Sequence, residues 1–119
     1  MFEDFTGVSC PPCPKGHDAV TNIQTAHPNR VVAMAIHPGG ISDPSGFNQA
    51  EPFDGEPNFN LPEISAKIWS IIGGKPGGIP YGLADRLLGE IGSSGWAANV
   101  DQRLAVPPTV NATILEVSY

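Results

Sequence analysis

Hydrophobic and polar positions over the first third of the chain follow a strand, helix, strand order. Residues 2–6 (FEDFT) predict a short strand, and after a turn we expect a helix that opens at Cys10 and runs to about Ala26. Apolar positions recur at helical spacing within it, namely Ala19, Val20, Ile23 and Ala26. Residues 30–36, which are apolar without interruption from Val31 onward, predict a strand buried on both faces. Two strands joined by a crossover helix should pair in parallel.

The middle of the chain alternates between irregular and periodic segments. Residues 38–62 show no periodicity and predict a long loop insertion, of a length that usually serves a function. A helix is expected over residues 62–72, with its isoleucines on one face: Ile64, Ile68, Ile71 and Ile72. Residues 79–84 then predict a short strand, and no obvious second long strand follows before the next helix, which would leave the sheet abbreviated.

The last third predicts one more helix and then a boundary. We expect a helix over residues 96–104, capped by Ser93 or Ser94, with an apolar stripe of Trp96, Val100 and Leu104. Residues 1–106 would form one α/β domain. Residues 107–119 begin with two prolines and then alternate, which is typical of a linker and a strand that starts a truncated β-rich domain.

Composition narrows the class of protein. The 119 residues are 40% hydrophobic and 15% charged, which excludes a charged disordered polymer, and 14 glycines with 13 prolines require many turns. Six basic against twelve acidic residues give a net charge of −6, and without a basic cluster nucleic acid is not expected as a partner. The apolar runs are too short to span a bilayer. Because the sequence enters a strand directly after Met1 and carries no targeting signal, we expect a targeting segment or anchor to precede it.

The chemistry is concentrated in residues 10–13 (CPPC), which hold the only cysteines of the chain. Positions i and i+3 of a helix lie on one face, so the two sulfur atoms can meet and close a small disulfide ring. At a helix N-terminus the free amide hydrogens and the helix dipole favour a thiolate, which is the nucleophilic form of cysteine. A CxxC motif beside a strand–helix–strand unit therefore favours redox chemistry.

Two other interpretations of the motif stay open. Half of a zinc site has the same spacing, and His17, His27 and His37 are the histidines that could complete it. A structural disulfide is the second alternative, although so short a loop restrains little of the unfolded chain.

Three segments together resemble the thioredoxin superfamily: residues 3–17 (EDFTGVSCPPCPKGH), 31–39 (VVAMAIHPG) and 78–86 (GIPYGLADR). More narrowly, the chain looks like the thioredoxin-like domain of an outer-membrane lipoprotein family of Gram-negative bacteria. The likeness covers roughly residues 2–106 and implies a central mixed sheet flanked by helices. Ser9 departs from thioredoxin itself, which has a tryptophan before the first cysteine, so a different docking surface is expected.

The resemblance also assigns roles to individual residues. It implies that Cys10 is the attacking, more exposed thiol and that Cys13 is the resolving thiol. Pro80 matches the cis-proline that packs beside the disulfide, and the backbone of Ile79 would pair with an extended substrate. Asp4 stands where thioredoxins carry a buried acid that exchanges a proton with the inner thiol, although an acid at a strand end can equally be solvated.

Two histidines are candidates for tuning the cysteine pair. His37 follows the second strand, and the carboxyl ends of parallel strands share one sheet edge with the CPPC turn. His17 lies four residues after Cys13 on the same helix. Either histidine could instead have only a structural role.

The sequence therefore predicts a thiol–disulfide oxidoreductase of the cell envelope that acts on protein thiols or disulfides, with no cofactor beyond the cysteine pair. The alternatives are a non-catalytic binding module of a surface protein and a copper or zinc carrier. Whether the pair reduces, oxidises or isomerises its substrates depends on its reduction potential, which the sequence does not give.

Overall fold

The structure is a computed structural model that describes residues 1–7, 10–38, 62–74 and 76–107. Within these ranges the elements follow one another in a fixed order: β1 (Phe2–Phe5), α1 (Cys13–Ala26), β2 (Ala33–Ile36), α2 (Pro62–Ile71), β3 (Tyr81–Ala84), β4 (Leu88–Ile91) and α3 (Trp96–Leu104). The predicted insertion and the segment after Pro107 lie largely outside the described residues.

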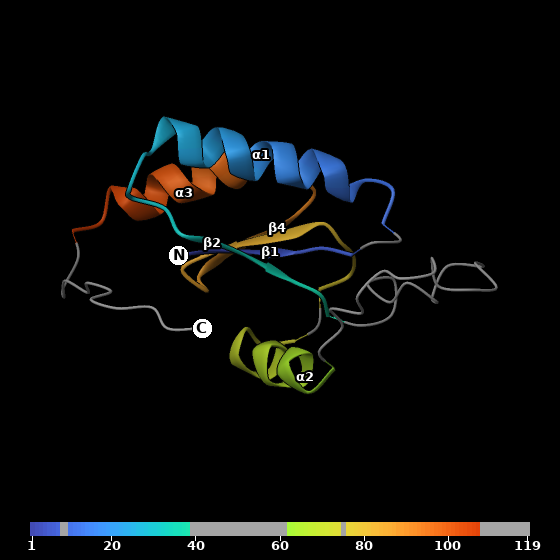
Figure 1. The fold of residues 1–119 in the computed structure, drawn as a ribbon. Coiled ribbons are helices and arrows are strands. Elements are labelled where there is room, and N and C mark those ends of the chain that lie inside the picture. The colour runs from blue at the N-terminus through green and yellow to red at the C-terminus, as the bar shows by residue number, and fades with distance from the viewer. Residues whose placement is uncertain (8–9, 39–61, 75, 108–119) are drawn as a thin grey trace, which may run out of the picture.

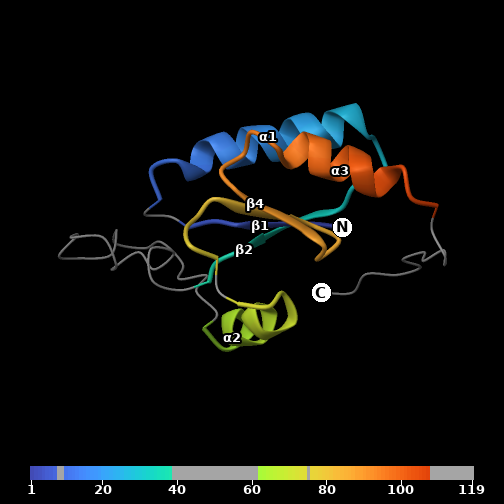
Figure 2. The same ribbon diagram turned by 180° about the vertical axis from the view of Figure 1, so that it is seen from behind.

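The strands form one mixed sheet in the order β2-β1-β3-β4. β1 pairs in parallel with β2 and antiparallel with β3, which in turn pairs antiparallel with β4. Helices α1 and α3 cover one face of this sheet and α2 covers the other (Figures 1 and 2). The expected α/β class, the parallel pairing of the first two strands and a mixed sheet flanked by helices are confirmed.

β1 is the central strand, and its side chains alternate between two cores. Phe2 packs on the α1–α3 side with Ile23, Trp96 and Val100, whereas Phe5 packs on the α2 side with Ile68. The same alternation sends Asp4 toward α1 and Glu3 toward the opposite face, where the Arg86 guanidinium donates two hydrogen bonds to Glu3.

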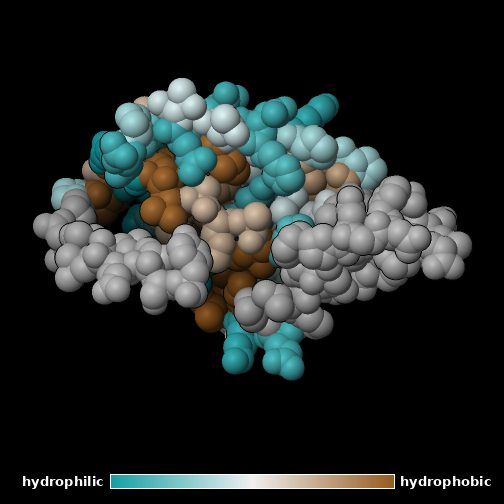
Figure 3. Space-filling view, in the orientation of Figure 1, coloured by the Kyte–Doolittle hydropathy of each residue, from teal (hydrophilic) through white to brown (hydrophobic). Residues whose placement is uncertain are grey.

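β2 differs from the strand that the sequence predicts. It begins at Ala33 rather than Arg30, and it lies at the edge of the sheet. Val32 is 65% exposed and Met34 44% exposed, so the expectation of a strand buried on both faces is wrong. An apolar run does not reveal whether a neighbouring strand covers it, and Figure 3 shows hydrophobic surface on the face where β2 lies.

The hairpin of β3 and β4 was not predicted as such; the sequence shows no second long strand before α3, and β4 is indeed only four residues long. Its turn holds Asp85 and Arg86 at φ of 49° and 57°, the left-handed backbone that a tight hairpin turn requires. Glycine or asparagine normally announces such a turn, and this one has neither. Four-residue strands also leave little alternation to detect.

The helices match their predicted positions with local corrections. α1 begins at Cys13, so Cys10 precedes the helix instead of opening it. In α2, Ile68 is buried but Ile71 is exposed, so these isoleucines do not share one buried face. The cap of α3 is Gly95 and not a serine, whereas Trp96 and Val100 are buried as expected. No helix in the described ranges has the length and apolarity needed to cross a membrane.

Candidate functional site

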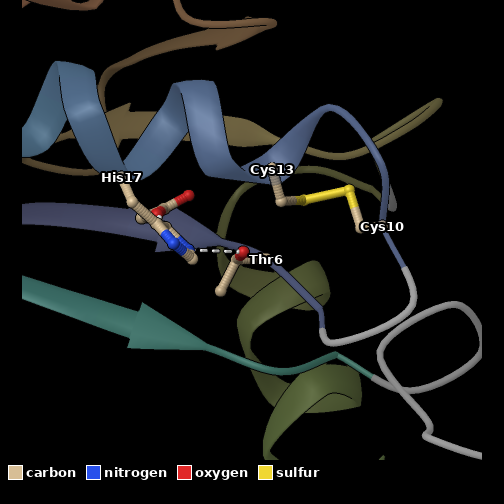
Figure 4. Close-up of a disulfide and its surroundings, with 5 residues drawn as sticks. Thr6, Cys10, Cys13 and His17 are labelled. Atoms are coloured by element: carbon tan, nitrogen blue, oxygen red, sulfur yellow. Dashed lines mark hydrogen bonds and ion pairs between the residues drawn. A yellow bond between two sulfur atoms is a disulfide. The ribbon is translucent and has the colours of Figure 1, made fainter.

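Cys10 and Cys13 are joined by a disulfide, with their Cα atoms 5.4 Å apart. Cys10 lies in the turn before α1, where its carbonyl accepts a hydrogen bond from the backbone amide of Cys13, the first residue of the helix (Figure 4). Cys10 is 5% exposed and Cys13 1% exposed. The spacing argument for a disulfide is therefore confirmed, and Cys10 is marginally the more accessible of two covered residues.

The loop before β3 packs against the same end of α1. The Ile79–Pro80 peptide bond is cis, as the resemblance implied. A Cβ atom added to Gly16, one turn after the start of the helix, would lie 3.2 Å from the Cβ of Pro80 and 2.9 Å from the Trp96 ring. The absence of a side chain at Gly16 therefore allows the helix to approach both Pro80 and α3.

Asp4 is a buried acid on the α1-facing side of β1. The residue is 3% exposed, and its Oδ1 atom has no hydrogen-bond partner within the described part of the chain. Burial raises the pKa of Asp4 to about 6, and the nearby charge of His17 acts in the opposite direction. Of the two expectations for Asp4, the structure therefore favours a buried acid over a solvated one.

His17 connects this acid to the surface. Its side chain descends from α1 on the same side as Cys13 and reaches Thr6, which follows the last residue of β1 (Figure 4). The Nε2 atom lies 2.9 Å from Thr6 Oγ1, in a hydrogen bond whose direction depends on the tautomer, and 3.7 Å from Asp4 Oδ2. The rest of the ring is accessible, because the side chain is 56% exposed.

His37 belongs to the same polar cluster. It follows β2 and is half-buried; burial, and secondly the charge of His17, lower its pKa. The parallel pairing of β1 and β2 thus brings Asp4, Thr6 and His37 to one end of the sheet, beside His17. That His37 tunes the disulfide, as the sheet-edge argument predicts, stays a prediction.

A groove between α1 and the edge strand β2 leads to this cluster. Asp4 and His17 line one part of it, and the remaining lining comes from Val20, Thr21, Gln24 and residues 33–35. Thr6 was not among the predicted site residues. Its place two positions after Asp4, on the same side of an extended chain, was the available signal.

His27, the third histidine weighed as a zinc ligand, lies at the other end of α1. Fourteen residues of helix separate it from Cys13, which corresponds to about 21 Å. It contacts Asp101 of α3 with 2.9 Å between Nε2 and Oδ1. Among the residues that the structure describes, no group of three or more histidine, cysteine or acidic side chains is arranged to hold a metal ion.

No protein-family model matches the chain, and no curated protein or solved structure shows significant similarity to it. The features of the site therefore stand on geometry and chemistry alone.

Proposed function

We propose that the chain forms a thioredoxin-like domain that exchanges disulfides with protein substrates through Cys10 and Cys13. One observation supports this most strongly: the cysteine pair lies at the end of α1 that packs against Pro80 through Gly16 and that carries His17, the neighbour of the buried acid Asp4. A disulfide with a purely structural role requires neither the Pro80 loop nor a buried acid. The element order and the mixed sheet are also compatible with a thioredoxin-like fold.

In the reducing direction, the exchange takes two successive steps. The Cys10 thiolate attacks one sulfur of a substrate disulfide, the S–S bond breaks, and the other substrate sulfur leaves as a thiolate. Cys13 then transfers its proton to a base and attacks Cys10 Sγ, which releases the second substrate sulfur. The protein loses two electrons, the substrate gains them, and the thiolates that leave take up protons from water. Oxidation of a substrate dithiol follows the same steps in reverse.

The local structure supplies what each step needs. Cys10 precedes the first turn of α1, whose free amide hydrogens stabilise a nearby thiolate. Asp4 is the proposed base for Cys13, because an acid with a pKa of about 6 is ionised near neutral pH and still retains affinity for a proton. The backbone of Ile79, next to cis-Pro80, is the proposed docking strand for an extended substrate.

The proposed setting is the cell envelope, which rests on the resemblance of residues 3–17 and 78–86 to an outer-membrane lipoprotein family. Envelope compartments are oxidising and favour disulfide chemistry. The proposed partners are proteins with accessible thiols or disulfides.

The function is tested by trapping the intermediate. The reduced Cys13→Ser protein should form a stable mixed disulfide with a disulfide-bonded test protein, because its Cys10 attacks but no thiol resolves the product. The Cys10→Ser protein should form no such adduct, and only the parent should turn over. Mass spectrometry of alkylated samples measures the mixed disulfide and the free thiols in the parent and in both variants.

Two results would overturn the proposal. A parent protein that is as inert as both variants supports a binding module with a static disulfide. Stoichiometric copper or zinc in the reduced parent, lost in both variants, supports the metal carrier.

A further inference from the structure

The contact between His17 and the buried Asp4 carries one further inference, which rests on the proposed function. We propose that His17 is a positioning residue that passes protons between solvent and Asp4, and that it thereby sets the pH range in which Cys13 reacts. Cys13 itself remains the reacting group.

Asp4 is too deeply buried to exchange protons with solvent directly. An acid that accepts a proton in each cycle must return it to solvent, yet the Asp4 side chain is only 4% exposed. The Nε2 atom of His17 lies 3.7 Å from Asp4 Oδ2, and the histidine side chain is itself 56% exposed. His17 is thus the described titratable group that contacts both the acid and water.

One carboxylate oxygen of Asp4 lacks a hydrogen-bond partner among the described residues. This oxygen, Oδ1, is buried, although Asp4 lines the groove between α1 and β2. A buried carboxylate normally fills its hydrogen bonds. A site that must take up and release a proton needs the open position, whereas a purely structural acid does not.

The side chain beside Asp4 is an imidazole, which is suited to proton transfer. Histidine is the residue whose proton exchanges near neutral pH, and the Nε2 atom that lies 3.7 Å from Asp4 Oδ2 is held in place by its hydrogen bond with Thr6 Oγ1. The other titratable group facing His17 is His37, which follows β2, while Lys15 and Asp18 on α1 are exposed to solvent.

The proton balance is simple. The Cys13 thiol transfers its proton to the Asp4 carboxylate, and Asp4 then gives that proton to neutral His17. The resulting imidazolium releases the proton to water or buffer in the groove. No electrons pass through His17.

The test uses His17→Gln, which keeps a polar side chain without a titrating ring, and His27→Gln as the matched control on the same helix. In weak buffer the His17→Gln protein should resolve a preformed mixed disulfide about tenfold more slowly than the parent, which is less than the roughly 10²- to 10⁴-fold typical of a group that takes the proton from the reacting atom itself. Added imidazole should restore most of the rate, and the His27→Gln protein should behave as the parent does. Equal rates in parent and His17→Gln, or a slow variant that imidazole does not restore, would overturn the inference.

A second readout does not depend on exchange activity. The carboxyl carbon resonance of Asp4, followed against pH by NMR, should titrate at a higher pH in His17→Gln, because the positive charge that His17 carries when protonated is gone. An unchanged midpoint would show that His17 and Asp4 are not coupled. If the parent exchanges no disulfides the proposed function fails, and this titration still decides whether His17 controls the protonation of Asp4.

Discussion

Asp4 is the residue at which stability and the proposed function oppose each other. Burial raises its pKa from 3.8 to about 6, so the folded protein binds this proton more tightly than the unfolded chain does. The stability that the protonated acid contributes is therefore lost as the pH rises from about 4 through 6. The lowered pKa of His37 acts in the other direction, because its protonation below its usual pKa of 6.5 disfavours the folded state.

Asp4→Asn is expected to stabilise the protein at pH 8 and to leave its stability nearly unchanged at pH 4. The upper limit of the gain at pH 8 is about 3 kcal/mol, the free energy of a shift of about two pKa units. Urea unfolding of parent and variant at both pH values measures it, and the comparison cancels the contribution of His37. Asp18→Asn, on the exposed surface of α1, is the control. Equal stability of Asp4→Asn and parent at pH 8 would mean that Asp4 is solvated.

The substitution that should stabilise the fold, Asp4→Asn, should also slow disulfide exchange. Asp4→Asn removes the proposed base, so the resolving step of Cys13 should be slower by a factor of about one hundred near neutral pH. Stopped-flow measurement of mixed-disulfide resolution checks this. If Asp4→Asn is more stable than the parent but resolves the mixed disulfide equally fast, Asp4 is not the base for Cys13.

At the scale of elements, three segments converge on Gly16. α1 approaches Trp96 of α3 and the Pro80 loop so closely that a methyl group on Gly16 would collide with the Trp96 ring and crowd Pro80. Trp96 is fully buried and packs against Phe2 with ring centroids 5.1 Å apart, so it has no free space into which to move. The position of the CPPC turn relative to the proline loop thus depends on a residue without a side chain.

Gly16→Ala should destabilise the protein by about 1 to 3 kcal/mol, although alanine is the better helix former. The control is Asn22→Ala on the exposed side of α1, which changes helix propensity without a collision. Thermal unfolding distinguishes them, since Gly16→Ala should lower the midpoint and Asn22→Ala should not. A Gly16→Ala protein as stable as the parent would show that α1 and the proline loop are not in close contact.

The elements also show where sequence patterns succeed. The 3.6-residue periodicity of Trp96 and Val100 predicted α3 to the residue, because a two-layer core selects one apolar stripe of a helix. β2 and the β3–β4 hairpin were harder. The exposure of Met34 depends on which strand lies beside it, and the turn at Asp85 relies on backbone conformations that its residue types do not announce.

At the scale of the whole molecule, the parallel pairing of β1 and β2 places Asp4 and His37 toward the same end of the sheet. This part could be predicted because parallel strands end at a common edge, whereas the role of these residues beside the CPPC turn stays a prediction. Thr6 and the packing of Gly16 against Pro80 depend on tertiary contacts that no local pattern encodes. The thioredoxin likeness stays a prediction.

The proposed function requires the Cys10–Cys13 pair to exchange electrons reversibly with other thiols. Equilibrating the protein with a series of glutathione redox buffers and counting alkylated cysteines by mass measures this exchange. We expect a reversible two-electron transition between about −270 and −120 mV, the range of known exchange proteins. A pair that stays oxidised even in buffers poised at about −300 mV would be a static structural disulfide, and the proposed function would be wrong.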